Sequence, residues 1–219
     1  MPKSFVTDQS GLVSFSIKSN GKAISDPIEV YSIKINEQIN TSTAEISILA
    51  GNPENGFSNV SDSDTFSPGA KIDIELGYDS KNTRVFTGTV TKQVIEADNS
   101  TVSYFKIVCI NENTPGNNKI EYNAAASPVL ELEYGENILN IELALNSKYQ
   151  SSILTKYTGF IVFPGTDLAK ANSLISLKGI SKRFDGNVYV SGVEHNVSNG
   201  NWLTKAIIGI SHETLDKSN

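Results

Sequence analysis

The sequence predicts a mostly β fold, made of two similar antiparallel β-barrel domains related by internal duplication. Apolar and polar residues alternate with a period of two through most of the 219 residues, which is the pattern of strands with one buried face. Asn-Gly pairs at 20–21 and 199–200 indicate tight hairpin turns. A Phe-x-Gly-x-Val pattern at 86–90 returns at 184–188, as expected of a duplicated unit.

In the first half of the chain, the alternation predicts strands at 13–17, 28–35, 43–48, 72–78, 85–95 and 102–110. The clearest strand contains Ile72, Ile74 and Leu76, which are separated by acidic residues. The turn before it contains proline and glycine, the usual turn residues. Strands in this order, joined by short turns, are typical of an antiparallel barrel or sandwich.

In the second half, the predicted elements are strands at 130–134, 174–180, 188–193 and 202–210, with a hairpin at Asp185-Gly186. The segment 136–150 fits two structures. Ile141, Leu143 and Leu145 suit a strand, whereas the spacing of the apolar residues also suits one face of a helix. The strand is the favoured interpretation. Residues 151–165 carry no clear pattern.

A polar stretch interrupts the alternation in the middle of the chain and indicates a junction between modules. The predicted division is a first β-barrel domain at 1–112, a junction at 113–127, a second β-barrel domain at 128–212 and a polar tail at 213–219. Each domain is long enough to bury a core of its own.

The duplicated motif also makes a prediction about symmetry. A shift of 98 residues places Phe86 on Phe184 and Gly88 on Gly186. Three copies of a chain with two similar barrels can close a ring of six similar units. The loop before the motif is expected to be longer in the first copy, at 78–85, and to mark where true threefold symmetry appears.

The residues assigned to the repeat and its structural motif are Phe66, Pro68, Gly69, Gly77, Phe86, Gly88, Val90, Gly179, Phe184, Gly186, Val188 and Trp202. Trp202 is expected to anchor a core or an interface. Arg84 and Arg183 precede the two motif copies. Either these arginines pair with carboxylates across subunits, or they are plain surface residues.

Composition narrows the classes of partner. The net charge of −6 disfavours nucleic acid, whose phosphates need a basic surface, and it disfavours a direct anchor on anionic membranes. No apolar run has the length of a membrane span, and the N-terminus lacks the pattern of a signal peptide. The single cysteine, Cys109, lies in an apolar run and is predicted to be a buried hydrophobic residue.

No catalytic, metal-binding or cofactor-binding residue is predicted. The two histidines, His195 and His212, have no second ligand at metal spacing. The segment Asp62-Ser63-Asp64 lacks the glycine and glutamate of a calcium-binding loop. The sequence contains no phosphate loop, nucleophile elbow or zinc-protease motif. The chain is therefore not expected to be an enzyme, and no cofactor is expected.

Several segments together resemble one protein family. They are 64–78, 85–90, 128–138, 177–195 and 200–211. These segments are similar to the hub region of VgrG-type spike proteins and to baseplate hub proteins of contractile phage tails. The resemblance covers most of the chain, and its closing motif lies in the last two segments.

This resemblance implies a structural hub of a contractile injection system, either type VI secretion-like or phage-tail-like. Two tail-tube-like domains in each chain of a homotrimer would form a pseudohexameric ring. The ring would adapt a hexameric inner-tube protein to a trimeric spike protein or spike domain, beside other baseplate proteins. Such a protein is made in the bacterial cytoplasm, assembled into the injection particle and delivered outward on firing.

The chain departs from this family in two ways. The family's outer domains and its spike β-helix have no counterpart among the 219 residues, so a separate spike protein or a longer parent protein is expected. Two other functions stay open. One is a β-sandwich carbohydrate-binding or adhesin module. The other is an enzyme such as a tail-associated muramidase, which would need a carboxylate pair that no segment supplies.

Overall fold

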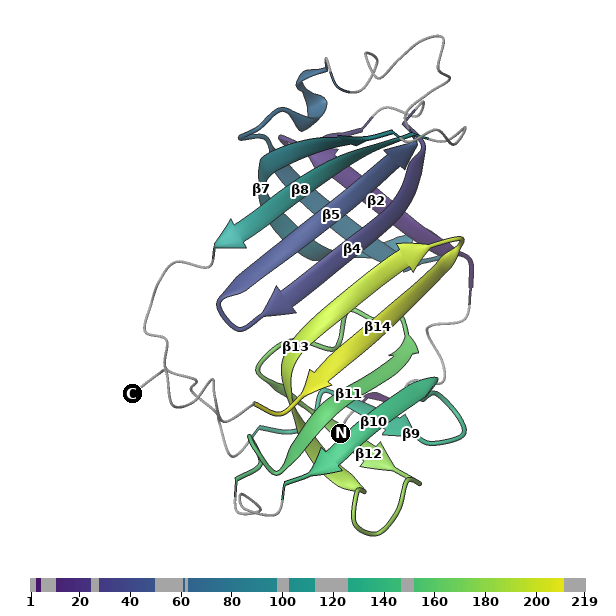
Figure 1. Ribbon diagram of the computed structural model, residues 1–219. Helices are drawn as coiled ribbons and strands as arrows, with labels where there is room; N and C mark the ends of the chain where they lie inside the picture. Colours follow the sequence, from purple (N-terminus) through teal and green to yellow (C-terminus); the bar gives the residue numbers. More distant parts are fainter. Residues whose placement is uncertain are drawn as a thin grey trace, which may run out of the picture.

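One hydrogen-bonded sheet of 14 strands runs through the described part of the chain (Figure 1). This computed structural model describes the residues 3–4, 11–24, 28–49, 61, 63–97, 103–112, 126–146 and 152–210. Besides these strands there is a short 3-10 turn at Asp64–Phe66. All but two of the strand pairs are antiparallel. The predicted mostly β, antiparallel fold is confirmed.

Six strands, which we call the first unit, pair in the order β2-β6-β7-β8-β5-β4. Their bounds are β2 Val13–Ser19, β4 Val30–Gln38, β5 Thr41–Leu49, β6 Lys71–Tyr78, β7 Lys81–Glu96 and β8 Tyr104–Glu112. The short β3, Lys22–Ala23, folds back on β2. The sheet of this unit curls, so that β2 passes behind β4 and β5 (Figure 1).

Six further strands, the second unit, pair in the order β9-β12-β13-β14-β11-β10. Their bounds are β9 Leu130–Glu133, β10 Asn140–Leu145, β11 Tyr157–Pro164, β12 Ser173–Lys178, β13 Gly186–Ser198 and β14 Asn201–Ile208. The short β1, Lys3–Ser4, lies parallel to β9. β9 is also parallel to β12, which requires a crossover connection, and β10 and β11 lie within that crossover.

The two units share one connectivity. Strands β2, β4, β5, β6, β7 and β8 of the first unit correspond to β9 through β14 of the second, in chain order as well as in sheet order. The units differ in the direction of their first strand, because β2 is antiparallel to β6 whereas β9 is parallel to β12. The shared connectivity supports the predicted duplication.

A matching β-bulge strengthens this correspondence. The register of β7 against β8 shifts at Thr91, and the register of β13 against β14 shifts at Ser191. In both bulges the hydroxyl of the extra residue donates a hydrogen bond across the pair. Thr91 donates to the Val108 carbonyl at 3.2 Å, and Ser191 donates to the Ile207 carbonyl at 3.3 Å. Each hydroxyl therefore satisfies a carbonyl beside the disrupted ladder.

Each unit encloses a hydrophobic core, and the first core also contains Val197 and Trp202 of the second unit. In the first unit the alternation of β6 buries Ile72, Ile74 and Leu76, as the sequence pattern predicts, and Phe66 of the 3-10 turn packs into the same core. The second core takes residues from β9 and β11 to β14. Burial of each large aliphatic side chain stabilises the fold by about 1.5–3 kcal/mol.

Both predicted Asn-Gly turns are confirmed. The φ angles are 48° and 80° at Asn20 and Gly21, and 50° and 72° at Asn199 and Gly200. Positive φ at both central residues defines the type I′ turn, whose twist matches that of the strands on either side. The second of these turns joins β13 to β14.

The predicted long loop at 78–85 is wrong. β6 runs to Tyr78 and β7 begins at Lys81. Asp79 and Ser80 alone make the turn, with φ angles of 49° and 63°. Aspartate tolerates this left-handed conformation, and an Asp79 carboxylate oxygen also accepts the N–H of Leu12 at 3.0 Å. The charged and polar residues at the start of β7 therefore belong to a strand.

The predicted hairpin at Asp185-Gly186 is confirmed, since β12 pairs antiparallel with β13, but its connection is longer than that dipeptide and takes residues 179–185. A carboxylate oxygen of Asp185 accepts the N–H groups of Ile180 and Ser181 at 2.9 and 3.1 Å. These bonds close the connection on itself. The longer of the two connections is thus in the second unit.

The ambiguous segment 136–150 contains strand β10 at 140–145, so the strand interpretation is confirmed there. Strand β11 was not predicted. It lies between β10 and β14, and its period is broken at Gly159, where a side chain would collide with the carbonyl of Glu142. A strand with neighbours on both sides and a glycine in its middle shows little alternation.

The sheet continues across the predicted domain boundary, because β13 of the second unit pairs with β4 of the first. Most of the predicted junction at 113–127 and the whole tail at 213–219 lie outside the described residues. The division into two domains stays a prediction.

Candidate functional site: the seam between the two units

The two units meet along one strand pair, which we call the seam. The first part of β13, up to Val190, pairs with β12 of its own unit. After the bulge the strand continues antiparallel to β4, from Gly192 opposite Gln38 to Ser198 opposite Ser32. β13 and β4 lie side by side in Figure 1. One long strand thus belongs to both units.

Trp202 links the second unit to the core of the first. It is 4% exposed and belongs, with Val197, to the hydrophobic cluster of the first unit. Its ring stacks on Tyr78 with 5.6 Å between centroids, and the Tyr78 hydroxyl donates to the Gly165 carbonyl at 3.2 Å. A side chain at Gly165 would overlap the indole. Trp202 therefore lies in a core and at the seam at once.

His195 is buried at the seam, with 1% of its surface exposed. Its Nδ1 lies 3.4 Å from Trp202 Nε1 and 3.1 Å from Thr204 Oγ1. Because an indole N–H only donates, Nδ1 is the acceptor and the ring proton is on Nε2. Thr204 Oγ1 in turn accepts the Thr166 N–H at 3.1 Å. Nε2 has no hydrogen-bond partner among the described residues.

This environment keeps the imidazole neutral. Burial, with a smaller contribution from the charge of Lys170, lowers the pKa of His195 from 6.5 to about 3. A proton added at Nδ1 would displace the indole donor and place a cation in the shared core, where charge is poorly solvated. His195 is therefore part of a structural hydrogen-bond chain that lies within the second unit, beside the seam.

A second polar contact crosses the seam beside this chain. One carboxylate oxygen of Glu37, in β4, accepts the N–H of Ala171 at 2.9 Å, and the other lies 3.6 Å from the ammonium of Lys170. The bond to a backbone N–H fixes the carboxylate more strongly than an exposed ion pair would alone. The loop before β12 is thereby held against the first unit.

The two copies of the Phe-x-Gly-x-Val motif have different surroundings. Phe86 lies within β7 in the first core, whereas Phe184 lies in the connection before β13 at the margin of the second core. A side chain at Gly88 would approach the Ile110 carbonyl to 2.8 Å. Gly186 has open space around it but a φ of 121°. The two bulges, at Thr91 and Ser191, are 100 residues apart, whereas the two motif copies are 98 residues apart. The motif copies are therefore not at structurally equivalent positions.

The other residues of the predicted motif form cores and turns. The Phe66 carbonyl accepts the side-chain amide of Gln93 at 2.7 Å. At Gly77, a side chain would collide with the carbonyl of Lys81. Those in the cores are Phe66, Val90 and Val188, and those in turns are Pro68, Gly69 and Gly179. All of these positions shape the fold around the seam.

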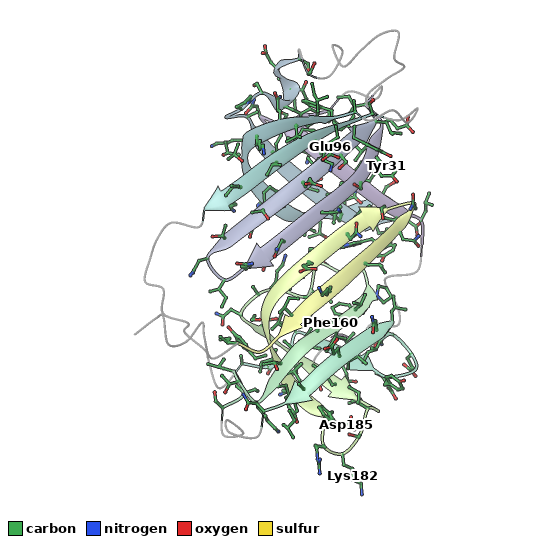
Figure 2. All side chains as sticks on the ribbon, viewed as in Figure 1. Tyr31, Glu96, Phe160, Lys182 and Asp185 are labelled. Atoms are coloured by element: carbon green, nitrogen blue, oxygen red, sulfur yellow. The ribbon has the colours of Figure 1, made fainter. Side chains whose placement is uncertain are left out.

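Arg84 and Arg183 are both exposed, but in different settings. The Arg84 guanidinium lies 4.0 Å from Asp73 on the neighbouring strand. Arg183 lies in the connection before β13, between Lys182 and Asp185, which Figure 2 shows at the end of the second unit that is far from the seam. The pairing of these arginines with carboxylates across subunits stays a prediction.

The predicted burial of Cys109 is confirmed, and burial raises the pKa of its thiol to about 12. Within the described residues, no three His, Cys, Asp or Glu side chains are grouped to hold a metal ion. Nor does this part of the chain contain a helix long and apolar enough to cross a membrane. His212 and Asp62 lie outside the described residues.

The seam was not predicted from the sequence. Contacts such as that of Glu37 with Ala171 join residues far apart in the chain. The alternation of apolar residues predicts that a strand forms, but it does not predict which other strand pairs with it. One signal was available in the run 188–197. This alternating run is longer than the strand at 173–178, with which its first residues pair. The later residues of the run therefore needed a different neighbouring strand.

Solved structures of tail proteins share this fold. The 43 kDa tail protein of prophage MuSo2 from Shewanella oneidensis superposes with a TM-score of 0.61 at 10% identity, covering 94% of this chain and 98% of that chain. A tail protein from Neisseria meningitidis MC58 gives 0.60 at 9% identity, with 92% and 97% covered. At these identities the likeness concerns the fold alone.

The E. coli c3393 protein, described as a component of the type VI secretion system with structural similarity to T4 bacteriophage tail proteins gp27 and gp5, gives a TM-score of 0.56. The identity is 8%, and 90% of this chain and 77% of that chain are covered. The resemblance of the sequence to baseplate hub proteins is thus confirmed in the fold.

No curated protein matches the sequence significantly. The profile of the Alg8 N-terminal domain family matches residues 9–117 and 146–199, which are more than half of the chain. The matched segments contain both strands of the seam and both bulges. The chain belongs to the Alg8 N-terminal domain family.

Proposed function

We propose that this chain is a structural, non-enzymatic hub subunit of a contractile injection system. The observation that carries the proposal is the pair of units with one connectivity, joined head to tail along the seam. A head-to-tail contact uses different surfaces on its two partners, and its repetition closes a ring where the rotation allows. Two units joined in this way are the first step of such a ring.

Three copies of the chain would place six units around one axis. The ring would be threefold in composition, because alternate units differ, and close to sixfold in outline. A ring of this kind can contact a sixfold tube on one face and a threefold partner on the other. The fold shared with phage tail proteins and with a type VI secretion component supports this role.

The expected partners follow from this symmetry. A hexameric inner-tube protein would bind one face, and a trimeric spike protein or spike domain would bind the other, with further baseplate proteins around the ring. The hub would assemble in the bacterial cytoplasm and leave with the particle on firing. The proposed role is mechanical, and the continuous sheet and the core shared at the seam suit a part that transmits load.

The mass of the purified protein in solution tests this function. At tens of micromolar, light scattering and native mass spectrometry should give three copies per particle, and negative-stain images should show a ring with six lobes. A monomer that binds glycans would instead support a carbohydrate-binding module. A twofold dimer, or turnover of peptidoglycan, would also contradict the hub.

A further inference from the structure

We infer that the outer edge of β10 in one copy of the chain pairs antiparallel with the C-terminal part of β7 in the next copy. This contact would repeat between chains what the seam does within a chain. The inference rests on the proposed ring and specifies which surfaces close it. Its partner is a second copy of this chain.

The strands of the two units correspond residue by residue. The extra residue of each bulge makes Thr91 the counterpart of Ser191. The carbonyls that accept their hydroxyl hydrogen bonds make Val108 the counterpart of Ile207. The register of the neighbouring strands then gives the counterparts in the strands beyond β8 and beyond β14. The row in the first unit is Val108, Glu45 and Lys34, and the corresponding row in the second unit is Ile207, Phe160 and Glu142. β10 is thus the counterpart of β4.

Within the described residues, the outer edge of β10 and the C-terminal part of β7 are both open. β4 has β5 on one side and β13 on the other, whereas its counterpart β10 has only β11. β7 pairs with β6 only up to Thr89, so its part from Lys92 to Glu96 has only β8 as a neighbour. The corresponding part of β13 forms the seam.

The open groups of β10 face outward. Asn146 donates its N–H to the Lys156 carbonyl on the β11 side, and the backbone groups of alternate residues in an antiparallel strand point to opposite sides. The N–H and C=O groups of Leu145, Leu143 and Ile141 therefore point to the open edge. An edge of this kind is a template for another strand.

Residues on the two open edges are less buried than their counterparts at the seam. At the seam, Ile35 of β4 lies opposite His195 of β13, and these residues are 2% and 1% exposed. Their counterparts are Leu143, which is only half-buried, and Ile95, which is 54% exposed. Both counterparts lie on the core-facing side of their strands, since Ile95 is opposite Phe105. A neighbouring strand at each edge would bury Leu143 and Ile95 as the seam buries Ile35 and His195.

The two edges belong to different ends of one molecule. Figure 2 labels Glu96 in the upper part of the first unit, and Figure 1 shows β10 in the lower part of the second unit. The contact must therefore form between chains. The direction also fits a ring, because each chain offers one edge of each kind.

The seam also sets the expected register. Asn196, five residues after Ser191, lies opposite Lys34, so Glu96 is expected opposite Glu142 of the next chain and Ile95 opposite Leu143. The two glutamates would face each other on the outer side, where Lys106, 2.6 Å from Glu96, offsets part of the repulsion. This like-charge pair makes the register testable.

Cysteine cross-linking tests the contact. The variant Ile95→Cys/Leu143→Cys should form covalent dimers and trimers under mild oxidation or with a short bismaleimide, and the buried Cys109 should not react. The control Ile95→Cys/Ala144→Cys places one thiol on the opposite face of β10 and should cross-link at least about tenfold less, because strand neighbours alternate between faces. Trimers that give no cross-link in the first variant would overturn the edge pairing and leave the hub intact.

A surface variant gives an independent measurement. Glu142→Lys would replace the like-charge pair by an opposite one, and we expect the trimer dissociation constant to fall about two- to fivefold at low salt. An unchanged or larger constant, with a folded protein by circular dichroism, would contradict the register. A protein that is monomeric in every variant would contradict the proposed function itself.

Discussion

The two units have the same connectivity but not the same completeness. The first unit contains Trp202 and Val197 of its neighbour within its core, and its edge strand β4 is covered by β13. Among the described residues, the core of the second unit contains none from the first, and its edge strand β10 has one neighbour. The second unit thus has an open edge at β10, where the corresponding strand β4 of the first unit is covered.

The seam is therefore part of the fold of the first unit rather than a contact between two separately folded domains. An indole from the second unit is buried to the same degree as the core residues of the first unit. The units should therefore lose structure together when the seam is damaged, whereas damage at the far end of the second unit should stay local.

The largest effect is expected from Trp202→Ala. Removal of a buried indole typically costs about 3–5 kcal/mol, and here the cavity opens in the core of the first unit. Urea unfolding should report the loss, and hydrogen exchange should show it in β6 as well as in β14. The neighbouring Leu203→Ala, at a partly exposed position, is the matched control. Loss of protection confined to the second unit would contradict the shared core.

A smaller effect is expected from acid. The unfolded chain takes up a proton on His195 below pH 6.5, whereas the folded chain does so only near pH 3. Stability from this group is complete above pH 6.5 and falls by about 1.4 kcal/mol per pH unit below it. Urea midpoints at pH 7 and pH 4.5 should differ less in His195→Gln than in the wild type. Equal pH dependence in both proteins would rule out this role.

The two bulges allow a comparison between equivalent positions. Ser191→Ala and Thr91→Val each remove one hydroxyl that donates to a carbonyl across the strand pair. We expect losses of about 1 kcal/mol for Ser191 and about 0.5 kcal/mol for the more exposed Thr91. Thermal unfolding of the two variants side by side gives the measurement. A loss in one variant only would show that the bulges are not equivalent.

The smallest effect on folding is expected from Arg84→Ala. Its guanidinium is exposed and 4.0 Å from Asp73, and such pairs contribute about 0.5 kcal/mol or less. Stability should stay within that range in this variant and in Arg183→Ala. Sedimentation then separates the two interpretations of these arginines. A weaker trimer indicates pairing across subunits, and an unchanged trimer indicates a plain surface residue.

The sequence predicted what depends on local pattern. The alternation of Ile72, Ile74 and Leu76 predicts a buried strand, and Asn-Gly pairs predict type I′ turns, because both depend on neighbours in the chain. The Phe-x-Gly-x-Val motif pointed to duplication, but its copies lie two residues from the structural match.

What was missed depends on distant pairing. β11 has little alternation because Gly159 interrupts it, and the seam joins β4 to a strand about 160 residues further along the chain. The burial of His195 follows from that pairing. In the sequence, His195 is one polar residue in an alternating strand. Its burial becomes visible only when the two units are packed together at the seam.

An electron cryomicroscopy map of the purified ring would test the proposed arrangement of the chains. We expect three chains and six units around the axis, with β13 beside β4 within each chain and β7 beside β10 between chains. A ring closed through other surfaces would contradict the edge pairing. A map of single chains or of twofold dimers would contradict the ring itself.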